Sequence, residues 1–403
     1  MNLVFPPQKS VSFSLLTVSL SLSVPVVQAF PVSTGVHAVP VPAEYGKSLS
    51  PHLWGIISSS NTYVVRQHLK LLPRGCNCFA CPTPCCVPQP TTFSVFAGPT
   101  PEQQVELIRF DEVSDDWNRC CCHPYHPWKI EARQHIPMPG DGSNLSDYSF
   151  LGQNIIDDFG RFDHVSRTSY LRDLYAQQPV LFTMQRNDGV RCCFKCPFKA
   201  LSCPVCFSCC QDGIHIYAGS TPGHPENPEK EIGRPYPVSP EKLIGSVTQP
   251  CGGGMCIPFL ELRDGPDGVA PFGKVAGPCC FGGWSEMCCD FDFRVSRYMS
   301  SRRSGDLAHI IKRAPVSASQ AVATLCCNGE ADVFGVNFQP QGNMTPQQKV
   351  TTLSAQVLLD FMLFDGQMRK CEVKNNTIYC YFCYSSILGC LVPWQICIPL
   401  GQN

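Results

Sequence analysis

Short segments with alternating apolar and polar residues run along most of the chain. Apolar side chains recur at every second position in residues 334–338 and 291–295, and Ile214 and Ile216 flank His215. This spacing places apolar side chains on one face of a β-strand. The 37 Pro and 31 Gly residues separate such runs. With only one convincing helical segment, the pattern favours an antiparallel barrel or sandwich.

That one helix is predicted near the carboxyl end, over residues 346–365. Thr345 can cap its N-terminus, Pro346 suits the first helical position, and Gln348 stands three residues after the cap. Val350, Leu353, Val357, Phe361 and Phe364 recur at helical spacing, and Leu358, Leu359, Met362 and Leu363 cover the other side of the second half. The charge-free run is far shorter than the roughly 18 residues of a membrane span, so enclosure by the chain's own strands is expected.

Several cysteine- and proline-rich blocks occur in order between residues 91 and 366. They are Asn118-Arg-Cys-Cys-Cys-His-Pro, Pro127-Trp-Lys-Ile130, Cys203-Pro-Val-Cys-Phe-Ser-Cys-Cys-Gln211, Ile244-Gly-Ser-Val-Thr-Gln249, Gly277-Pro-Cys-Cys280 with Cys289-Asp-Phe-Asp-Phe293, and residues 330–364. Ordered blocks arise by chance far less often than one short motif. Together they resemble the phospholipid scramblase family, which is related to the Tubby carboxyl-terminal fold. The resemblance implies an all-β domain in which a closed antiparallel barrel of about 12 strands surrounds a buried C-terminal helix.

Four regions follow from this interpretation. Residues 1–30 resemble a signal or leader segment, and residues 31–60 form a proline-containing linker. Residues 61–366 form the barrel domain, with an insertion near 137–180 and the central helix at 346–365. Residues 367–403 form a hydrophobic tail rich in cysteine and aromatic residues.

The tail contains 23 residues, Ile378 to Leu400, without a formal charge. This length can cross a bilayer, and the basic Arg369, Lys370 and Lys374 before it would then leave the barrel in the cytosol. Its aromatic residues and Pro393 also suit a segment that lies in the membrane interface, or a strand pair packed on the barrel. Four further acylation sites are expected in this segment: Cys380, Cys383, Cys390 and Cys397.

Twenty-eight cysteines, many of them in doublets, require an explanation. Disulfides, zinc and thioester acylation are the alternatives, and a disulfide framework is less expected in a chain with ample apolar material for a core. Short spacings, as in Cys76-x-Cys78-x2-Cys81, suit zinc. The family's central cluster carries palmitate, which the resemblance places on Cys203, Cys206, Cys209 and Cys210. Acylation is therefore favoured, and the remaining doublets are interpreted as buried core thiols.

Calcium is a weaker expectation. In scramblases a stretch similar to an EF-hand loop binds calcium, and the resemblance carries its ligand positions onto Glu330, Asp332, Phe334, Val336 and Gln341. Only two of these five residues are acidic, so a low-affinity site competes with a core strand that begins with polar residues.

Charge excludes some functions and leaves others open. The net charge of −1 shows no excess of basic residues of the kind that binds nucleic acid. The pair Lys312-Arg313 is interpreted as part of a solvated face. Asp360 is expected to be a hydrogen-bonded core carboxylate and not a catalytic group. The chain contains no phosphate-binding glycine loop, nucleophile elbow or HExxH motif, so no enzyme is predicted.

Two functional classes remain. The resemblance implies a protein of the plasma membrane or an endomembrane that moves phospholipids between leaflets in both directions without ATP. This movement is expected with or without calcium stimulation. The protein would act alone, with other copies of itself or with other membrane proteins. The alternative is a lipid-tethered binding or scaffolding module of the Tubby-like type, because a barrel filled by its own helix leaves no obvious polar channel. A zinc-dependent structural protein is a third, less favoured interpretation.

Overall fold

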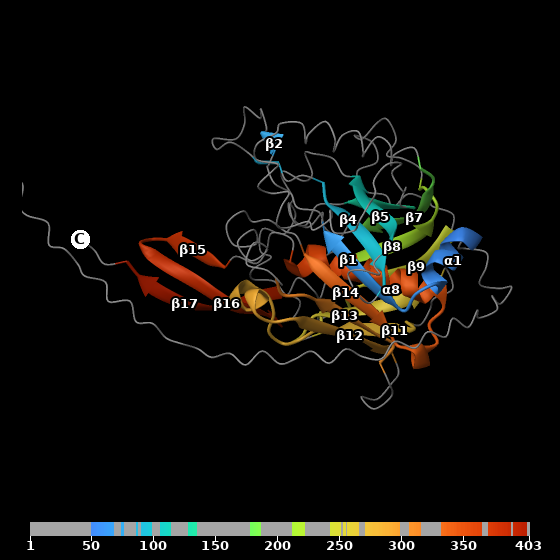
Figure 1. Ribbon diagram of the computed structural model, residues 1–403. Coiled ribbons are helices and arrows are strands. Elements are labelled where there is room, and N and C mark those ends of the chain that lie inside the picture. Colours follow the sequence, from blue (N-terminus) through green and yellow to red (C-terminus); the bar gives the residue numbers. More distant parts are fainter. Residues whose placement is uncertain are drawn as a thin grey trace, which may run out of the picture. The chain divides into compact units, whose positions relative to one another are not determined.

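The structure is a computed structural model of the chain (Figure 1). It describes residues 50–67, 74–75, 86–87, 90–98, 105–113, 128–134, 178–186, 212–221, 242–250, 253–254, 256–265, 271–298, 306–315, 332–364, 370–387 and 390–400. All of them belong to one unit, residues 40–403.

Twelve antiparallel strands close into a barrel (Figure 1). Each strand pairs with its neighbour in the barrel sequence, and β14 closes the barrel on β1 through pairs such as Val65↔Phe334. The strands are β1 (Thr62–Gln67), β4 (Thr92–Ala97), β5 (Val105–Val113), β6 (Lys129–Gln134), β7 (Val180–Arg186), β8 (Gly213–Ala218), β9 (Leu243–Thr248), β10 (Phe259–Asp264), β11 (Gly273–Ala276), β12 (Phe291–Arg297), β13 (Ala308–Lys312) and β14 (Val333–Phe338). The short strands β2 (Arg74–Gly75) and β3 (Cys86–Val87) pair separately. The predicted fold class is confirmed.

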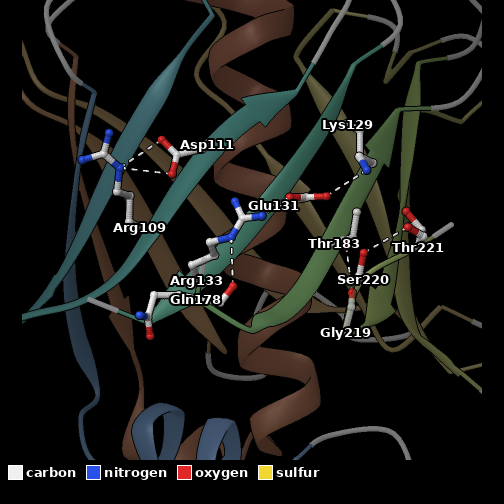
Figure 2. Close-up of polar contacts among 10 residues, drawn as sticks. All are labelled: Arg109, Asp111, Lys129, Glu131, Arg133, Gln178, Thr183, Gly219, Ser220 and Thr221. Atoms are coloured by element: carbon white, nitrogen blue, oxygen red, sulfur yellow. Dashed lines mark hydrogen bonds and ion pairs between the residues drawn. The ribbon is translucent and has the colours of Figure 1, made fainter. Parts of the chain in front are cut away.

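The alternating pattern decides which side chains line the barrel. In β1 every second residue is buried, and Tyr63 and Val65 belong to the core. The opposite side of the wall carries charge pairs, which Figure 2 shows on β5 and β6. Arg109 pairs with Asp111 at 2.9 Å, and Glu131 accepts from both Lys129 and Arg133.

These charge pairs join residues two apart on one strand, because such side chains share a face. Burial tends to raise the pKa of Glu131, but the hydrogen bond and charge of Lys129, together with Arg133, bring this pKa below its ordinary value. Figure 2 also shows Arg133 donating to the Gln178 carbonyl oxygen. The wall is thus apolar inside and charge-paired outside.

The predicted helix lies inside the barrel. It comprises α8 (Pro346–Leu359), which continues as a π-helical turn, η10 (Asp360–Phe364). Its capping box is complete: the Thr345 hydroxyl accepts from the Gln348 amide at 3.2 Å, and the Gln348 side chain accepts from the Thr345 amide at 3.1 Å. Nearly every side chain from Gln347 to Phe364 is buried. Enclosure by the chain's own strands is therefore confirmed.

The first half of this helix is more polar than its apolar second half suggests. Thr351, Thr352 and Ser354 are fully buried, and each donates its hydroxyl to the backbone carbonyl four residues earlier. These bonds satisfy the hydroxyl groups within the helix itself. The barrel can therefore enclose them without a partner on the wall.

A second helix, α1 (Pro51–Ser58), lies where the sequence predicted a linker. The Ser50 hydroxyl caps it by accepting from the Leu53 amide at 3.2 Å, and Pro51 occupies its first turn. Leu53 and Ile57, four residues apart, are fully buried in the core. The sequence reading missed this short helix, because eight residues are too few for a clear helical period, although the Ser-Pro start signal is present.

The C-terminal tail forms a three-stranded antiparallel sheet, with β15 (Cys371–Lys374), β16 (Thr377–Ile387) and β17 (Cys390–Pro399). Of the three alternatives for residues 378–400, the structure shows the strand pair, since β16 and β17 pair along their length. In the described part of the chain, no helix has the length and apolar character needed to cross a membrane.

Candidate functional site

The C-terminal sheet is attached to the barrel by a covalent joint. A disulfide links Cys280, in the segment after β11, to Cys383 in β16, with their Cα atoms 5.8 Å apart. Next to it, Phe281 and Tyr384 exchange backbone hydrogen bonds of 3.0 and 2.7 Å. Two predictions are corrected by this joint: Cys280 is not a free core thiol, and Cys383 is not available for acylation.

Buried charges lie beside this joint. The Lys312 ammonium, at the end of β13, is 2.9 Å from Asp332 Oδ1 and 3.3 Å from Glu286 Oε1. Glu286 belongs to the short helix η8 (Gly283–Met287), and its other oxygen lies 3.3 Å from Lys370, just before β15. The side chain of Lys312 is only 5% exposed. The expectation that Lys312 lies on a solvated face was therefore wrong.

The carboxylates hold Lys312 in its charged form. Burial acts to lower the pKa of Lys312, but the charges of Asp332 and Glu286, with a contribution from buried Asp360, raise this pKa above its ordinary value. Lys312 stays cationic because its carboxylate partners compensate for the loss of water. The cluster connects β13, η8 and the residue that leads into β15.

Aromatic rings complete this end of the barrel. Phe364, the last residue of η10, lies 5.9 to 6.4 Å from four other rings, and the Lys312 ammonium is 4.5 Å from its centre. The four partners are Phe281, Phe291, Phe293 and Phe334. The inner helix therefore ends against the same residues that carry the joint, since Phe281 follows the disulfide-bonded Cys280 directly.

One side of the C-terminal sheet packs on the protein. Tyr381 and Tyr384 are buried and stack with their ring centres 5.9 Å apart, and Tyr379 and Leu391 pack against the core. The Tyr381 hydroxyl donates to Glu372 at 2.9 Å. This side explains why the sheet is held at the barrel and not merely tethered to it.

The opposite side of the sheet is apolar and exposed. The strand register aligns Cys371, Cys380 and Ile396 across the sheet, and Val373, Ile378 and Ile398 in the next row. Trp394, opposite Cys383, is 60% exposed, and Val373 is 67% exposed. Phe382, at an irregularity of β16, is also exposed. We call Val373, Ile378, Trp394, Ile396 and Ile398 the apolar face. Clustered exposed apolar residues of this kind are typical of interaction surfaces, so this face is the candidate site.

The thiols are at the surface more often than predicted. Free cysteines are exposed at Cys256, Cys279, Cys288, Cys289, Cys371 and Cys397, and Cys380 is partly exposed. The doublets at 279–280 and 288–289 are therefore not buried core thiols. Among the described residues, no group of three or more His, Cys, Asp or Glu residues is placed to hold a metal ion. Cys203, Cys206, Cys209 and Cys210, the predicted palmitate sites, lie outside the described residues, as does the zinc candidate at 76–81.

The described members of the predicted calcium set lie before β14, within it and after it. Glu330 lies outside the described residues, and Asp332 is engaged with Lys312. Phe334 and Val336 turn their side chains into the core. Gln341, on the short helix η9 (Pro340–Gly342), donates to the side chain of Gln339 just before that helix. A six-residue strand spans roughly 20 Å. The structure therefore does not bring Asp332 and Gln341 together, and calcium binding stays a prediction.

Comparison of the chain with protein-family models, with curated proteins and with solved structures finds no match. The fold and the site together define a closed twelve-stranded barrel with an internal helix and an appended sheet whose apolar face is exposed.

Sequence reasoning missed the joint and the Lys312 cluster. The alternation of β13 could have indicated the cluster, because Ala308, Ile310 and Lys312 recur at every second position and all three are buried. Nothing in the sequence alone pairs Cys280 with Cys383 among 28 cysteines.

Proposed function

We propose that this protein is a membrane-associated barrel whose C-terminal sheet inserts its apolar face into the lipid interface. The barrel would then act as a lipid-tethered binding or scaffolding module of the Tubby-like type. The observation that carries the proposal is the exposure of Val373, Trp394, Ile396 and Ile398 on one side of the sheet, while Tyr381 and Tyr384 on the other side pack against the core. Trp is favoured at membrane interfaces because its ring is amphipathic.

The filled interior favours a module over a channel. The helix α8 is enclosed by the strands, and the buried hydroxyls along it bond to their own helix. A phospholipid headgroup needs a polar route, and in the described part of the barrel the inner helix fills the space where such a route would run. Lipid would therefore be contacted at the surface of the appended sheet.

Phospholipid scrambling is the second candidate. It is supported by the agreement between the observed barrel with its inner helix and the fold that the resemblance to scramblases implies. In this function the protein would move lipids between leaflets without ATP, with palmitate on Cys203, Cys206, Cys209 and Cys210 as an additional anchor. Calcium, if required, would act through a site that remains to be located.

Vesicle flotation of the full chain tests membrane association. The variant Ile396→Ser/Ile398→Ser should reduce the fraction that floats with phosphatidylcholine–phosphatidylserine vesicles, because it removes two apolar side chains of the face. Val113→Ser is the matched control, since Val113 is an exposed apolar residue of barrel strand β5. Equal flotation of both variants and the wild type would contradict the proposal.

The fluorescence of Trp394 tests whether the apolar face inserts into the membrane. Vesicles made with brominated lipid should quench tryptophan emission in the wild type more than in Trp394→Phe, because bromine quenches only rings that reach the acyl region. If the apolar face instead binds a second copy, sedimentation would show a concentration-dependent dimer that Ile396→Ser/Ile398→Ser abolishes, and quenching by lipid would be absent.

Scrambling is measured separately with vesicles that carry a fluorescent lipid quenchable from outside. If the protein exposes inner-leaflet lipid to the quencher, with or without calcium, the second candidate is supported. If accessibility stays at the value of empty vesicles while flotation persists, the module function stands. Acyl-biotin exchange across residues 203–210 tests the palmitate prediction.

A further inference from the structure

Two free thiols face each other on the C-terminal sheet. Cys371 in β15 and Cys380 in β16 are directly paired in the strand register, and their sulfur atoms lie 3.6 Å apart. Cys371 is exposed and Cys380 is partly exposed, so small molecules in solvent can reach them. Directly opposed residues in antiparallel strands have Cα atoms about 4.5 to 5.5 Å apart, which is within the range of disulfides.

The turn of the hairpin fixes this pairing. Asn375 and Asn376 both have positive φ angles, 50° and 56°, as a tight two-residue hairpin turn requires. Hydrogen-bonded and non-hydrogen-bonded pairs alternate along the hairpin, and the Tyr381 amide bonds to the Lys370 carbonyl at 2.9 Å. Cys371 and Cys380 therefore occupy the adjacent, non-hydrogen-bonded pair, where side chains approach most closely.

We propose that Cys371 and Cys380 form a redox-active dithiol that takes small disulfides, such as glutathione disulfide, as its oxidant. One cysteine thiolate attacks a sulfur of glutathione disulfide, which releases one glutathione thiolate and leaves a mixed disulfide on the protein. The second cysteine thiolate then attacks the protein sulfur of that mixed disulfide and releases the second glutathione. Two cysteine thiols are oxidised and one glutathione disulfide is reduced, and the two protons that the cysteines give up are taken up by the two released glutathione thiolates.

Neighbouring cysteines lack this arrangement. Cys397 is opposite Tyr379 and so points to the other side of the sheet from Cys380. Cys288 and Cys289 also have sulfur atoms 3.6 Å apart, but they are adjacent in sequence. A disulfide between them would close a small ring through their planar peptide bond, which resists distortion. Only the hairpin pair of these combines proximity with a backbone suited to closure.

Oxidation would also alter the side of the sheet that carries the apolar face. Cys371 and Cys380 lie in the row beside Val373 and Ile378. A closed disulfide removes two thiols that could otherwise carry an acyl chain, so oxidation and acylation exclude each other at these residues. This consequence rests on the proposed membrane function, whereas the exchange reaction does not.

Mass spectrometry of the full chain in glutathione buffers of defined potential tests the proposal. After alkylation, trypsin and chymotrypsin cut beyond Lys374 and Tyr381, which separates Cys371, Cys380 and Cys383 onto different peptides. In oxidising buffer, the peptide with Cys371 should become linked to the peptide with Cys380, and dithiothreitol should reverse the link.

Single variants test the two-step order. In Cys380→Ser, Cys371 should retain glutathione as a mixed disulfide, because the resolving thiol is missing, and the linked peptide should be lost. Cys397→Ser and Cys288→Ser should leave the link unchanged. The proposal is overturned if wild-type Cys371 and Cys380 take up glutathione independently or pair with other cysteines. It is also overturned if both thiols remain reduced, and are therefore alkylated, in every glutathione buffer. Flotation, measured on the same samples, reports the membrane proposal separately, because oxidation does not require vesicles.

Discussion

The Lys312 ammonium lies 4.5 Å from the centre of the Phe364 ring, where the end of a barrel strand meets the end of the inner helix. A cation over an aromatic face is attracted by the ring, and more strongly so when both are removed from water. The same ammonium pairs with Asp332 and Glu286. One side chain thus connects the wall, the inner helix and the joint of the C-terminal sheet.

Lys312→Met should lower the free energy of unfolding by about 3–5 kcal/mol, because two carboxylates remain buried after their shared cation is removed. Equilibrium unfolding in urea measures the change. The adjacent Arg313 is the control: its pair with Asp290 is more than 40% exposed on both side chains, so Arg313→Ala should cost less than about 1 kcal/mol. Equal effects of the two substitutions would show that the Lys312 cluster is not a buried ion network.

Removing the disulfide should loosen the C-terminal sheet. Cys280→Ser/Cys383→Ser opens a loop that spans 103 residues in sequence, so a loss of roughly 2–5 kcal/mol is expected. Hydrogen exchange should accelerate at the Phe281 and Tyr384 amides, which bond to each other's carbonyls. Cys279→Ser, which changes an exposed free thiol, should have neither effect. Unchanged exchange in the double variant would mean that packing alone holds the sheet.

Gly245 in β9 allows the inner helix to approach the wall. A Cβ atom there would lie 2.4 Å from the Thr351 hydroxyl oxygen and 2.7 Å from the Arg263 carbonyl oxygen. Gly245→Ala should therefore destabilise the fold by about 1–3 kcal/mol through overpacking, as measured by urea unfolding. Gly55→Ala is the control, because no atom lies within 4 Å of the added methyl group and the residue is inside α1. That change should be neutral or stabilising by up to about 1 kcal/mol.

His309 should make stability depend on pH. Its Nδ1 lies 3.0 Å from Asp292 Oδ1 and its Nε2 lies 3.3 Å from Asp306. The hydrogen bond with Asp292 raises the pKa of His309 above its ordinary value, against the opposing effects of burial and Arg294. Its stabilisation is thus complete below the unfolded pKa of about 6.5 and is lost as pH rises through the folded pKa.

At low pH, protonation of Asp292 removes the stabilising interaction between His309 and Asp292. Burial acts to raise its pKa, but His309 and Arg294 lower it overall. Its contribution is therefore present above the unfolded pKa of about 3.9 and disappears as pH falls through the lower folded value. His309→Gln should flatten the decline in stability between about pH 6 and pH 8, by up to about 1 kcal/mol. If the stability of His309→Gln falls with pH as steeply as that of the wild type, another titrating group causes the decline.

Local chemistry made much of the fold predictable. The period of two in residues 334–338 and the capping residues Thr345, Pro346 and Gln348 act between near neighbours, so the sequence alone indicated the strand and the start of the helix. The apolar second half of that helix also required enclosure. By contrast, residues 378–400 are apolar in either a helix or a strand pair, so their pattern did not decide between the two. The Asn375-Asn376 turn, which joins β15 to β16, was an overlooked local signal for strands in the tail.

The site depended on partners distant in sequence. Lys312 and Arg313 are adjacent, yet one is buried and the other half exposed, because successive side chains at the end of β13 point to opposite sides. The sequence determined the strands, the inner helix and the apolar character of the tail, since these depend on spacing and composition. Only the tertiary structure decided that Cys280 meets Cys383 and that Lys312 meets Asp332, because such pairs form where barrel closure brings remote segments together.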